Sequence, residues 1–394
     1  MSPIPRALVV GCLAAALPVF AVYAPVPDQD QVQGKDLNIT LKAGLANDSN
    51  IFGAASSEID STIWTVAPRG SYSASLTDQT FLSVSYGLTV DQFEDRPGDK
   101  LLDSHDASLR LAHAFSKTTT IDINDSFMVA RNPESLLAGV KLNTDQSFLR
   151  NQIDGRFITP LGAKATGTIK ARSIYYEYRD AALGRSLDRI ENLYGASADY
   201  AVLPEVKAVA EFRHQDVFYT KLGETKNKSS DYLMAGADYE VARKLSLSGR
   251  VGAEWRSREA ERSTTSPYVE FSAKYDYTEK SYLLGGFAYT LEETSDTARF
   301  NDTKVYRTFV SVMHYVGAFT VASASLTYEP STLQGRRTQV NVDETTVRGG
   351  VALSYLPTKN WTLSASYDHD RVRSDDVQRK LKRNRFGLSA VYTF

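Results

Sequence analysis

Cysteine is almost absent from this chain of 394 residues, and its single example is Cys12. Cys12 lies in an N-terminal segment that we expect to be removed, so the mature chain offers no disulfide, no cysteine zinc ligand and no cysteine nucleophile. The 5 histidines are scattered, and no pair stands at the spacing of metal ligands. A glycine-rich phosphate loop is also missing. We therefore expect no cofactor and no resident metal.

The chain also lacks an excess of charge of one sign, because 45 basic residues and 47 acidic residues give a net charge of −2. This balance provides no electrostatic basis for binding nucleic acid. Beyond the N-terminal segment no stretch has 18 consecutive apolar residues, which excludes a transmembrane helix from the mature chain. The hydrophobic content of 42% and the mean hydropathy of −0.31 are typical of a soluble protein. A membrane β-barrel has the same averages, because only alternate strand residues face lipid.

The N-terminus has the organisation of a secretory signal peptide. Arg6 supplies the positive start, an apolar run follows, and small residues precede cleavage near Ala21 or Ala24. A retained N-terminal anchor is one alternative. A lipoprotein box ending at Cys12 is another.

Strand periodicity fills the rest of the sequence. The last strand, Phe386–Phe394, alternates apolar and polar residues with one exception. In the segment 245–257, apolar residues such as Trp255 alternate with charged residues such as Arg250 and Glu254. Charges on the inner face of strand after strand would be costly in a dry sandwich core, but they are tolerated beside a water-filled lumen. We expect about 18 strands, near 37–46, 62–76, 80–92, 105–116, 119–130, 146–159, 163–178, 188–202, 205–219, 230–241, 245–257, 267–277, 281–293, 304–316, 319–329, 344–356, 360–372 and 381–394.

The connections between these strands alternate in length. Short ones such as Leu203-Pro204 alternate with long ones such as 46–61 and 131–145. Bacterial outer-membrane barrels have short periplasmic turns and long outer loops, so an even strand count places both termini in the periplasm. The predicted fold is all-β, a single antiparallel up-and-down transmembrane β-barrel in a bacterial outer membrane. The predicted organisation is a signal peptide over 1–24, a short periplasmic linker over 25–36 and the barrel over 37–394.

The inward positions of the strands carry charges of both signs. A strongly selective pore would show one sign dominating a constriction, and here the signs nearly balance. Either the charges pair across neighbouring strands and solvate the wall, or they line a hydrophilic conduit for a large polar solute such as polysaccharide. The inward aromatic residues Phe148, Tyr176 and Tyr232 either stack on sugar rings or fill space. The predicted pore-lining residues are Lys42, Arg69, Arg110, Arg150, Asp154, Arg156, Lys170, Arg172, Glu211, Arg213, Asp238, Arg250, Glu254, Glu270, Lys274, Arg348, Arg383 and Arg385.

No motif predicts catalysis. Asp103-Ser-His105-Asp106 has the residue types of a catalytic triad, but neighbours on a strand point to opposite faces and cannot converge. Asn47-Asp-Ser-Asn50 and Asp368-His-Asp370 offer oxygen ligands of the kind that calcium takes, and such clusters are also ordinary turns or solvated loops. We predict that the protein is not an enzyme.

The terminal strand carries a second kind of signal. Its terminal aromatic residue resembles the signal by which bacterial outer-membrane proteins are recognised for assembly, and this resemblance assigns the role to Phe386, Tyr392 and Phe394. Phe394, Tyr392 and Trp361 should lie at the periplasmic interface, where aromatic rings are favoured. The implied partners are outer-membrane lipids and the barrel-assembly machinery.

The opening strand carries a family resemblance. Ala43-Gly-Leu-Ala-Asn-Asp-Ser-Asn-Ile-Phe52 resembles the first strand of the beta-barrel porin-2 family, in which a glycine-containing strand runs into an Asp-Ser-Asn turn. Residues 62–77, with Pro68, resemble the strand that follows. The resemblance covers residues 37–394 and implies an outer-membrane pore.

Members of that family often accompany bacterial exopolysaccharide machinery. The resemblance therefore makes a conduit for exopolysaccharide or capsular polysaccharide secretion the leading hypothesis, with a periplasmic polysaccharide export protein as a partner. A general diffusion or small-solute porin is the first alternative. A non-transport outer-membrane barrel that acts as an enzyme or adhesin is the second.

Overall fold

The computed structural model describes residues 36–131, 147–221, 226–241, 244–259, 261–294, 296, 299–336 and 338–394. The predicted signal peptide and nearly all of the predicted linker lie outside the described residues. The described residues contain a sheet of 18 strands, a short helix α1 (Ala181–Leu187) and a 3₁₀ turn η3 (Val377–Arg379). The strands are β1 (Leu37–Asp48), β2 (Ser61–Thr77), β3 (Thr80–Phe93), β4 (Leu101–Ala114), β5 (Thr120–Ala130), β6 (Phe148–Pro160), β7 (Ala165–Tyr178), β8 (Arg189–Leu203), β9 (Val206–Tyr219), β10 (Lys228–Val241), β11 (Leu245–Arg258), β12 (Thr264–Tyr275), β13 (Tyr282–Glu292), β14 (Phe300–Tyr315), β15 (Thr320–Gly335), β16 (Val342–Tyr355), β17 (Trp361–Ser374) and β18 (Leu381–Thr393).

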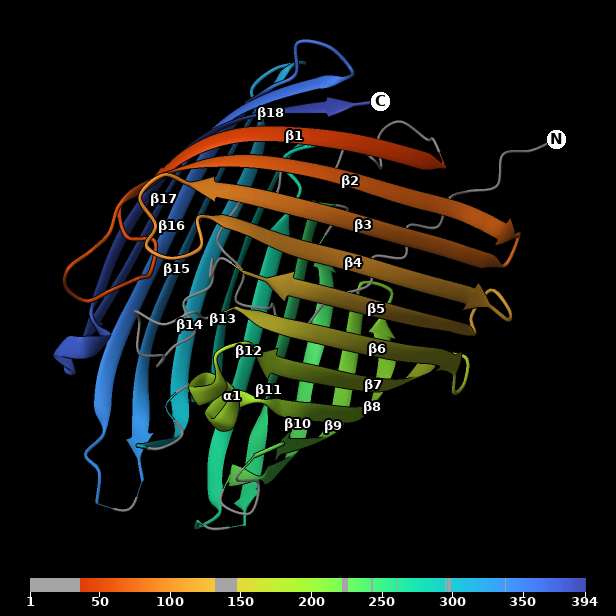
Figure 1. Ribbon diagram of the computed structural model, residues 1–394. Coiled ribbons are helices and arrows are strands. Elements are labelled where there is room, and N and C mark those ends of the chain that lie inside the picture. The colour runs from red at the N-terminus through yellow and green to blue at the C-terminus, as the bar shows by residue number, and fades with distance from the viewer. Residues whose placement is uncertain are drawn as a thin grey trace.

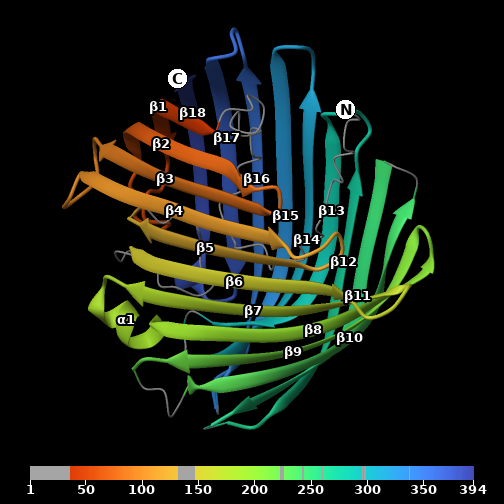
Figure 2. The same cartoon turned by 90° about the vertical axis from the view of Figure 1, so that its right-hand side faces the viewer.

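The sheet closes on itself. Each strand pairs antiparallel with its neighbour in sequence, and β1 also pairs with β18, from Thr40 opposite Thr393 to Asp48 opposite Arg385. Figures 1 and 2 show β1 beside β18 and the other strands wrapped around the barrel in chain order. Each of the predicted strands corresponds to one of these, so the predicted all-β up-and-down barrel is confirmed.

The two faces of the sheet differ in chemistry, because successive side chains of a strand point to opposite sides. One face presents exposed apolar side chains, among them Trp64, Leu353 and Phe386. The other face carries the charged residues, and some of these reach across an intervening strand, as Lys170 of β7 does to Glu211 of β9. Side chains from non-adjacent strands meet only on the concave side of a closed sheet, so the charged face lines the inside.

The two ends of the barrel carry connections of different length. We call the end with the connections 49–60, 94–100, 131–147, 179–188, 220–227, 259–263, 293–299, 336–341 and 375–380 the loop rim. The other end, where both β1 begins and β18 ends, is the turn rim. The expected strict alternation of short and long connections is wrong at one place, since only five residues join β11 to β12 at the loop rim and six join β12 to β13 at the turn rim. The reason is that several strands extend further toward the loop rim than their sequence pattern indicates, which shortens the loops.

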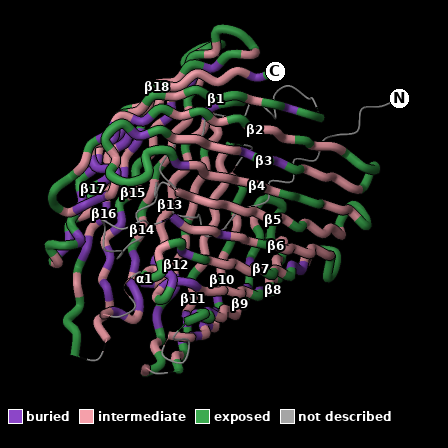
Figure 3. Tube along the Cα trace, in the orientation of Figure 1, coloured by how far each residue is buried: buried purple, intermediate pink, exposed green. Residues whose placement is uncertain are grey.

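Burial is uneven along the barrel axis. Buried positions gather in the halves of the strands next to the loop rim, for example over Glu344–Arg348 of β16 and Lys228–Met234 of β10 (Figure 3). No helix within the described part of the chain is long and apolar enough to cross a membrane.

A closed sheet satisfies every ladder hydrogen bond internally, and an apolar outer face needs lipid to cover it. The protein is therefore an integral β-barrel of a bacterial outer membrane, as the sequence predicts.

Candidate functional site

The candidate site is the inner wall of the barrel. The strand register places all eighteen predicted pore-lining residues on one face of the sheet. This face also carries Asp48 and is opposite the exposed apolar side chains. Most of the eighteen residues form ion pairs, either with a residue of another strand or with a residue two positions along the chain. The pairs differ in how far water reaches them, and this divides the wall into three regions.

The first region is a belt of alternating charge on β13–β18. Its members are Glu292, Arg307, Glu329, Arg348, Asp370 and Arg385, and we call them the charge belt. Arg307 contacts Glu292 at 2.9 Å and Glu329 at 2.6 Å. Arg348 lies directly opposite Asp370 in the ladder, and Arg385 contacts Asp370 at 3.4 Å. From Arg307 to Asp370 each charge thus lies between charges of the opposite sign, which compensates the desolvation of the belt.

The belt continues across the seam where the barrel closes. Nε of Arg383 on β18 donates to both carboxylate oxygens of Asp48 on β1, at 2.9 Å each, and the Arg383 and Asp48 side chains are only 2% and 1% exposed. Asp48 also accepts a hydrogen bond from the backbone of Asn50 at 3.0 Å. The side chain of Asn50 donates to the carbonyl of Lys382 at 3.2 Å, and Ser49 accepts from the backbone of Asn384 at 2.8 Å. The Asp-Ser-Asn segment therefore fastens the first strand to the last.

The connection after β1 folds over an apolar cluster at the loop rim. Ile51 is 2% exposed and packs with Ile63, Phe93 and Leu102 from β2, β3 and β4. The side-chain amide and carbonyl of Asn50 both bond the backbone of Ala54, which holds this loop in a tight turn. Part of the inner wall at the loop rim is thus packed rather than open.

The second region is a buried ionic cluster under the loop rim, formed by Lys228, Glu254, Arg256, Glu293 and Asp302. We call it the loop-rim cluster. Arg256 contacts Glu254 at 2.8 Å and Asp302 at 2.6 Å, and all three side chains are no more than 3% exposed. Lys228 contacts Glu293 at 2.7 Å and Asp302 at 3.1 Å.

Glu293, which follows β13, connects the cluster to a more distant strand. Its carboxylate accepts from the Tyr219 hydroxyl of β9 at 2.7 Å. Burial alone would raise the pKa of Glu293, but Lys228 and Arg256 outweigh burial and lower that pKa to about 2. The carboxylate is therefore ionised at any physiological pH, and it ties the end of β13 to β9, β10 and β11 across the inside of the barrel.

The third region is a solvated wall on β1–β9. Lys42 of β1 is exposed on the inner face. Arg69 contacts Asp106 at 2.9 Å with side chains 41% and 40% exposed, and Arg110 contacts Asp122 at 2.8 Å with Arg110 51% exposed. Water therefore reaches the inner wall here.

Other predicted residues follow the same pattern of pairing. Arg156 also contacts Asp122, Arg172 contacts Asp154, Arg213 contacts Glu211, Arg250 contacts Asp238, Lys274 contacts Asp276, and Glu270 accepts from the Tyr268 hydroxyl. Hydroxyl groups lie between the charges, as where Ser73 meets Ser83 at 2.9 Å and Ser85 meets Ser108 at 2.8 Å.

The inward aromatic residues are packed. Tyr176 lies beneath the guanidinium of Arg189, 4.2 Å from the ring centroid, and Arg150 is 5.7 Å from the same ring. Tyr232 is buried against Met234 and Tyr268. These contacts favour the interpretation in which the aromatic rings fill space.

The two polar motifs have structural roles. His105 contacts Asp103 at 3.0 Å on the outer face, whereas Ser104 and Asp106 point inward, so the triad types do not converge. Asp368 and Asp370 lie on the inner wall, where Arg385 contacts Asp370. Over the described residues no group of three or more His, Cys, Asp or Glu side chains could hold a metal ion.

The terminal aromatic residues form a cluster on the outer face of the turn rim. The ring of Tyr392 lies 5.0 Å from that of Trp361 and 4.8 Å from that of Phe394, and Phe394 is 57% exposed. Phe386 shares the outer face but lies opposite Tyr367, away from this rim. The structure thus brings Tyr392 and Phe394 together and leaves Phe386 apart.

Sequence reasoning missed the centre of the loop-rim cluster. Lys228, Glu293 and Asp302 fall at the edges of predicted strands or in predicted loops, where the alternation does not assign a residue to the inner wall. Extending the two-residue period back by one step from Ser230, the start of the predicted strand, assigns Lys228 to the inner wall.

Comparison with known proteins finds no matching family model and no matching curated protein. Among solved structures, the copper transporter OprC matches at a TM-score of 0.47 and 14% identity, over 88% of this chain and 63% of that one. The FrpB iron transporter of Neisseria meningitidis matches at 0.44 and 13% identity, over 89% and 64%. The chain thus spans less than two thirds of the length of these two transporters. The outer membrane protein OpdK of Pseudomonas aeruginosa matches at 0.47 and 10% identity, over 91% and 98%.

Proposed function

We propose that the barrel is an outer-membrane conduit for a hydrophilic solute, with a secreted exopolysaccharide chain as its cargo. The observation that carries this proposal is a solvated inner wall whose charges neutralise one another. A wall of paired charges stays hydrated but presents no net field, so it neither traps nor repels an uncharged polar chain. The hydroxyl groups of Ser73 and Ser83, which are partly exposed, offer hydrogen bonds that a sugar exchanges readily for water.

The orientation is part of the proposal. Connections at the turn rim have two to six residues, and those at the loop rim have five to seventeen. Because barrels of this kind keep their short turns in the periplasm, the turn rim faces the periplasm, together with the start of β1 and the end of β18. The turn rim is then the surface that a periplasmic polysaccharide export protein would contact.

The experiment is deletion of the gene in its host, followed by measurement of surface polysaccharide. We expect a marked fall, restored by the wild-type chain and not by a variant in which Lys42→Trp obstructs the inner wall. Ala43→Trp is the matched control, since Ala43 is the next residue and points outward. Unchanged surface polysaccharide in the deletion strain would reject this cargo.

A small-solute diffusion pore is the second candidate, and the loop-rim cluster favours it. Glu293 and Asp302 bring β9, β10, β11 and β14 together inside the barrel, which narrows the path at that end. For such a pore we expect Glu293→Gln to raise the largest sugar that enters liposomes in a swelling assay. Glu205→Gln, an equal change of charge in an exposed turn at the other rim, should leave that limit unchanged.

A further inference from the structure

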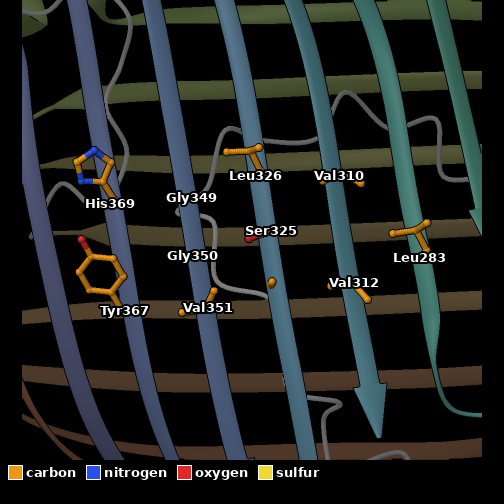
Figure 4. Close-up of a pocket in the computed structure, with 11 residues that line it drawn as sticks. Leu283, Val310, Val312, Ser325, Leu326, Gly349, Gly350, Val351, Tyr367 and His369 are labelled. Carbon is orange, nitrogen blue, oxygen red and sulfur yellow. The ribbon is translucent and has the colours of Figure 1, made fainter. Parts of the chain in front are cut away.

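The outer face of the barrel has an apolar groove of about 290 Å³ over β13–β17. Leu283, Val310, Leu326 and Val351 form its walls, and Tyr367 and His369 close one end (Figure 4). Its floor includes Gly349, where the missing side chain leaves the hollow. A Cβ atom at this position would meet Leu326 at 3.7 Å, which is an ordinary contact, so packing does not require glycine here. Such a hollow in a lipid-facing surface accepts a hydrocarbon chain.

Beyond Tyr367 and His369 the same outer face becomes cationic. Arg371 of β17 lies directly opposite Lys382 of β18, and Arg373 is two residues further along β17. All three are exposed, and none forms an ion pair or side-chain hydrogen bond with another described residue. Like charges directly opposite each other on neighbouring strands destabilise a sheet, so an anion that binds between them relieves repulsion.

Other parts of the outer face near the loop rim have the opposite sign. Between β4 and β10 the outward positions near this rim include Asp103, Glu177, Asp216 and Asp231. An anion approaching the rim is therefore attracted to β17 and β18 and repelled by the opposite side. Asp343 and Asp375 lie still further out and are separated from the groove by the three cations.

The height of the cations matches a membrane surface. Trp361 marks the turn rim on β17, and Arg371 follows it by ten residues on the same strand. At a rise of about 3.3 Å per residue and a tilt of about 40°, that distance spans about 25 Å, the height of the apolar band of such barrels. The groove thus lies within the hydrocarbon, and the cations lie at the headgroups.

We propose that β13–β18 bind a phosphate-bearing lipid of the outer leaflet. One acyl chain occupies the groove over Gly349, and the phosphate lies between Arg371, Arg373 and Lys382, where guanidinium groups provide bidentate contacts. The assignment to the outer leaflet rests on the orientation given in the proposed function. The binding itself does not depend on what the barrel transports.

The test is native mass spectrometry of the purified barrel titrated with bisphosphorylated lipid A in detergent. We expect a complex with one retained lipid, and about tenfold or greater loss of affinity for the variant R371Q/R373Q/K382Q. The control K117Q/K164Q/K280Q removes three exposed cations from turn-rim connections and should bind as the wild type does. Equal affinity of both variants would overturn the phosphate site.

A second variant tests the groove. Gly349→Leu fills the hollow and should weaken lipid A binding severalfold, while Gly70→Leu, at an outward position with open space around it, should not. Dephosphorylated lipid A should bind weakly, and inorganic phosphate should compete poorly because it cannot fill the groove. Full competition by inorganic phosphate, unaltered binding by Gly349→Leu, or a groove occupied by a second copy of the barrel would each overturn the proposal.

Discussion

Asp48 and Arg383 join the first and last strands of the barrel through a fully buried carboxylate–guanidinium pair. Removing one partner of such a pair leaves an uncompensated buried charge, at a cost of about 3–5 kcal/mol. We therefore expect Asp48→Ala to lower the free energy of unfolding by about that amount. The measurement is urea unfolding in detergent, followed by the heat-modifiable shift of the folded barrel on gels.

The matched control is Asp106→Ala, which breaks the pair between Asp106 and Arg69. Those side chains are about 40% exposed, so the loss should be about 1 kcal/mol or less. Arg383→Gln in the Asp48→Ala background should recover stability relative to Asp48→Ala alone, because no charge is then left buried. Equal losses for Asp48→Ala and Asp106→Ala would contradict a special role for the seam.

At this scale the sequence predicts the face on which a residue lies but not its partner. The two-residue period places Arg383 on the inner wall, because this assignment needs only the alternation of side chains along one strand. The partner of Arg383 is Asp48, 335 residues away, and the ladder sets Arg385 rather than Arg383 opposite Asp48. The diagonal contact depends on barrel closure and on side-chain length, and neither is visible in a single sequence.

At the scale of elements, the sequence locates the strands but not their ends at the loop rim. The sequence pattern predicts that β15 ends at Glu329, before a proline, yet the strand continues through Pro330 to Gly335. Pro330 has no N–H to donate, and the ladder with β14 skips Glu329 and Pro330 and resumes at Ser331, while the ladder with β16 is continuous. Because its ladder with β16 is intact, β15 continues past a proline that would end a strand without such a neighbour.

Two connections of the loop rim are joined by one ion pair. Arg299, just before β14, contacts Asp376 of the β17–β18 connection at 2.8 Å. The hydrogen bond from Arg299 lowers the pKa of Asp376 below its usual value of 3.8. A lowered carboxylate pKa stabilises the folded contact above the usual value and loses that stabilisation as the pH falls through the lowered value. We therefore expect the contact to persist at pH 4 and to break only well below 3.8.

Limited proteolysis of the β17–β18 connection with an acid-active protease measures the pH at which the contact between Arg299 and Asp376 breaks. Asp376→Asn should show at pH 6 the cleavage that the wild type shows only in stronger acid. Asp375→Asn is the control, because Arg299 pairs with Asp376 and not with the neighbouring carboxylate, so its loss should leave the cleavage pattern unchanged. Cleavage of the wild type that begins above pH 5 would contradict the lowered pKa.

At the scale of the whole molecule, the near balance of inner charges predicts weak ion selectivity. In planar bilayers we expect a reversal potential close to zero in a salt gradient. Replacing the inward acids by Asp106→Asn and Asp122→Asn leaves Arg69, Arg110 and Arg156 uncompensated, which should shift the pore toward anions. The outward acids Asp103 and Asp125 provide the control, since Asn at both positions removes equal charge from the lipid side and should leave the reversal potential unchanged. A strongly selective wild-type pore would contradict the paired wall.

The last strand connects the fold of the barrel to its assembly. The backbone N–H of Phe394 donates to the carbonyl of Ile39 at 3.0 Å, and its ring packs on Tyr392 at the turn rim. Deleting Phe394 removes one exposed side chain worth at most about 2 kcal/mol of apolar transfer, too little to unfold a large barrel. As a terminal aromatic residue, Phe394 also resembles the signal by which outer-membrane proteins are recognised for assembly. Deletion of Phe394 should therefore reduce delivery of the barrel to the outer membrane and leave the stability of the delivered barrel nearly unchanged.

We therefore expect deletion of Phe394 to lower the amount of barrel in the outer membrane markedly, with accumulation or degradation in the periplasm. Barrel refolded from the same variant in detergent should unfold at nearly the wild-type urea concentration. Phe115→Ala is the matched control, because Phe115 is an aromatic residue of the same rim with an exposed fraction of 58%, against 57% for Phe394. If the loss of exposed apolar surface were the cause, both variants would lower the amount of barrel in the outer membrane to the same extent. Wild-type amounts of folded, surface-exposed barrel from the deletion would show that assembly does not depend on this terminus.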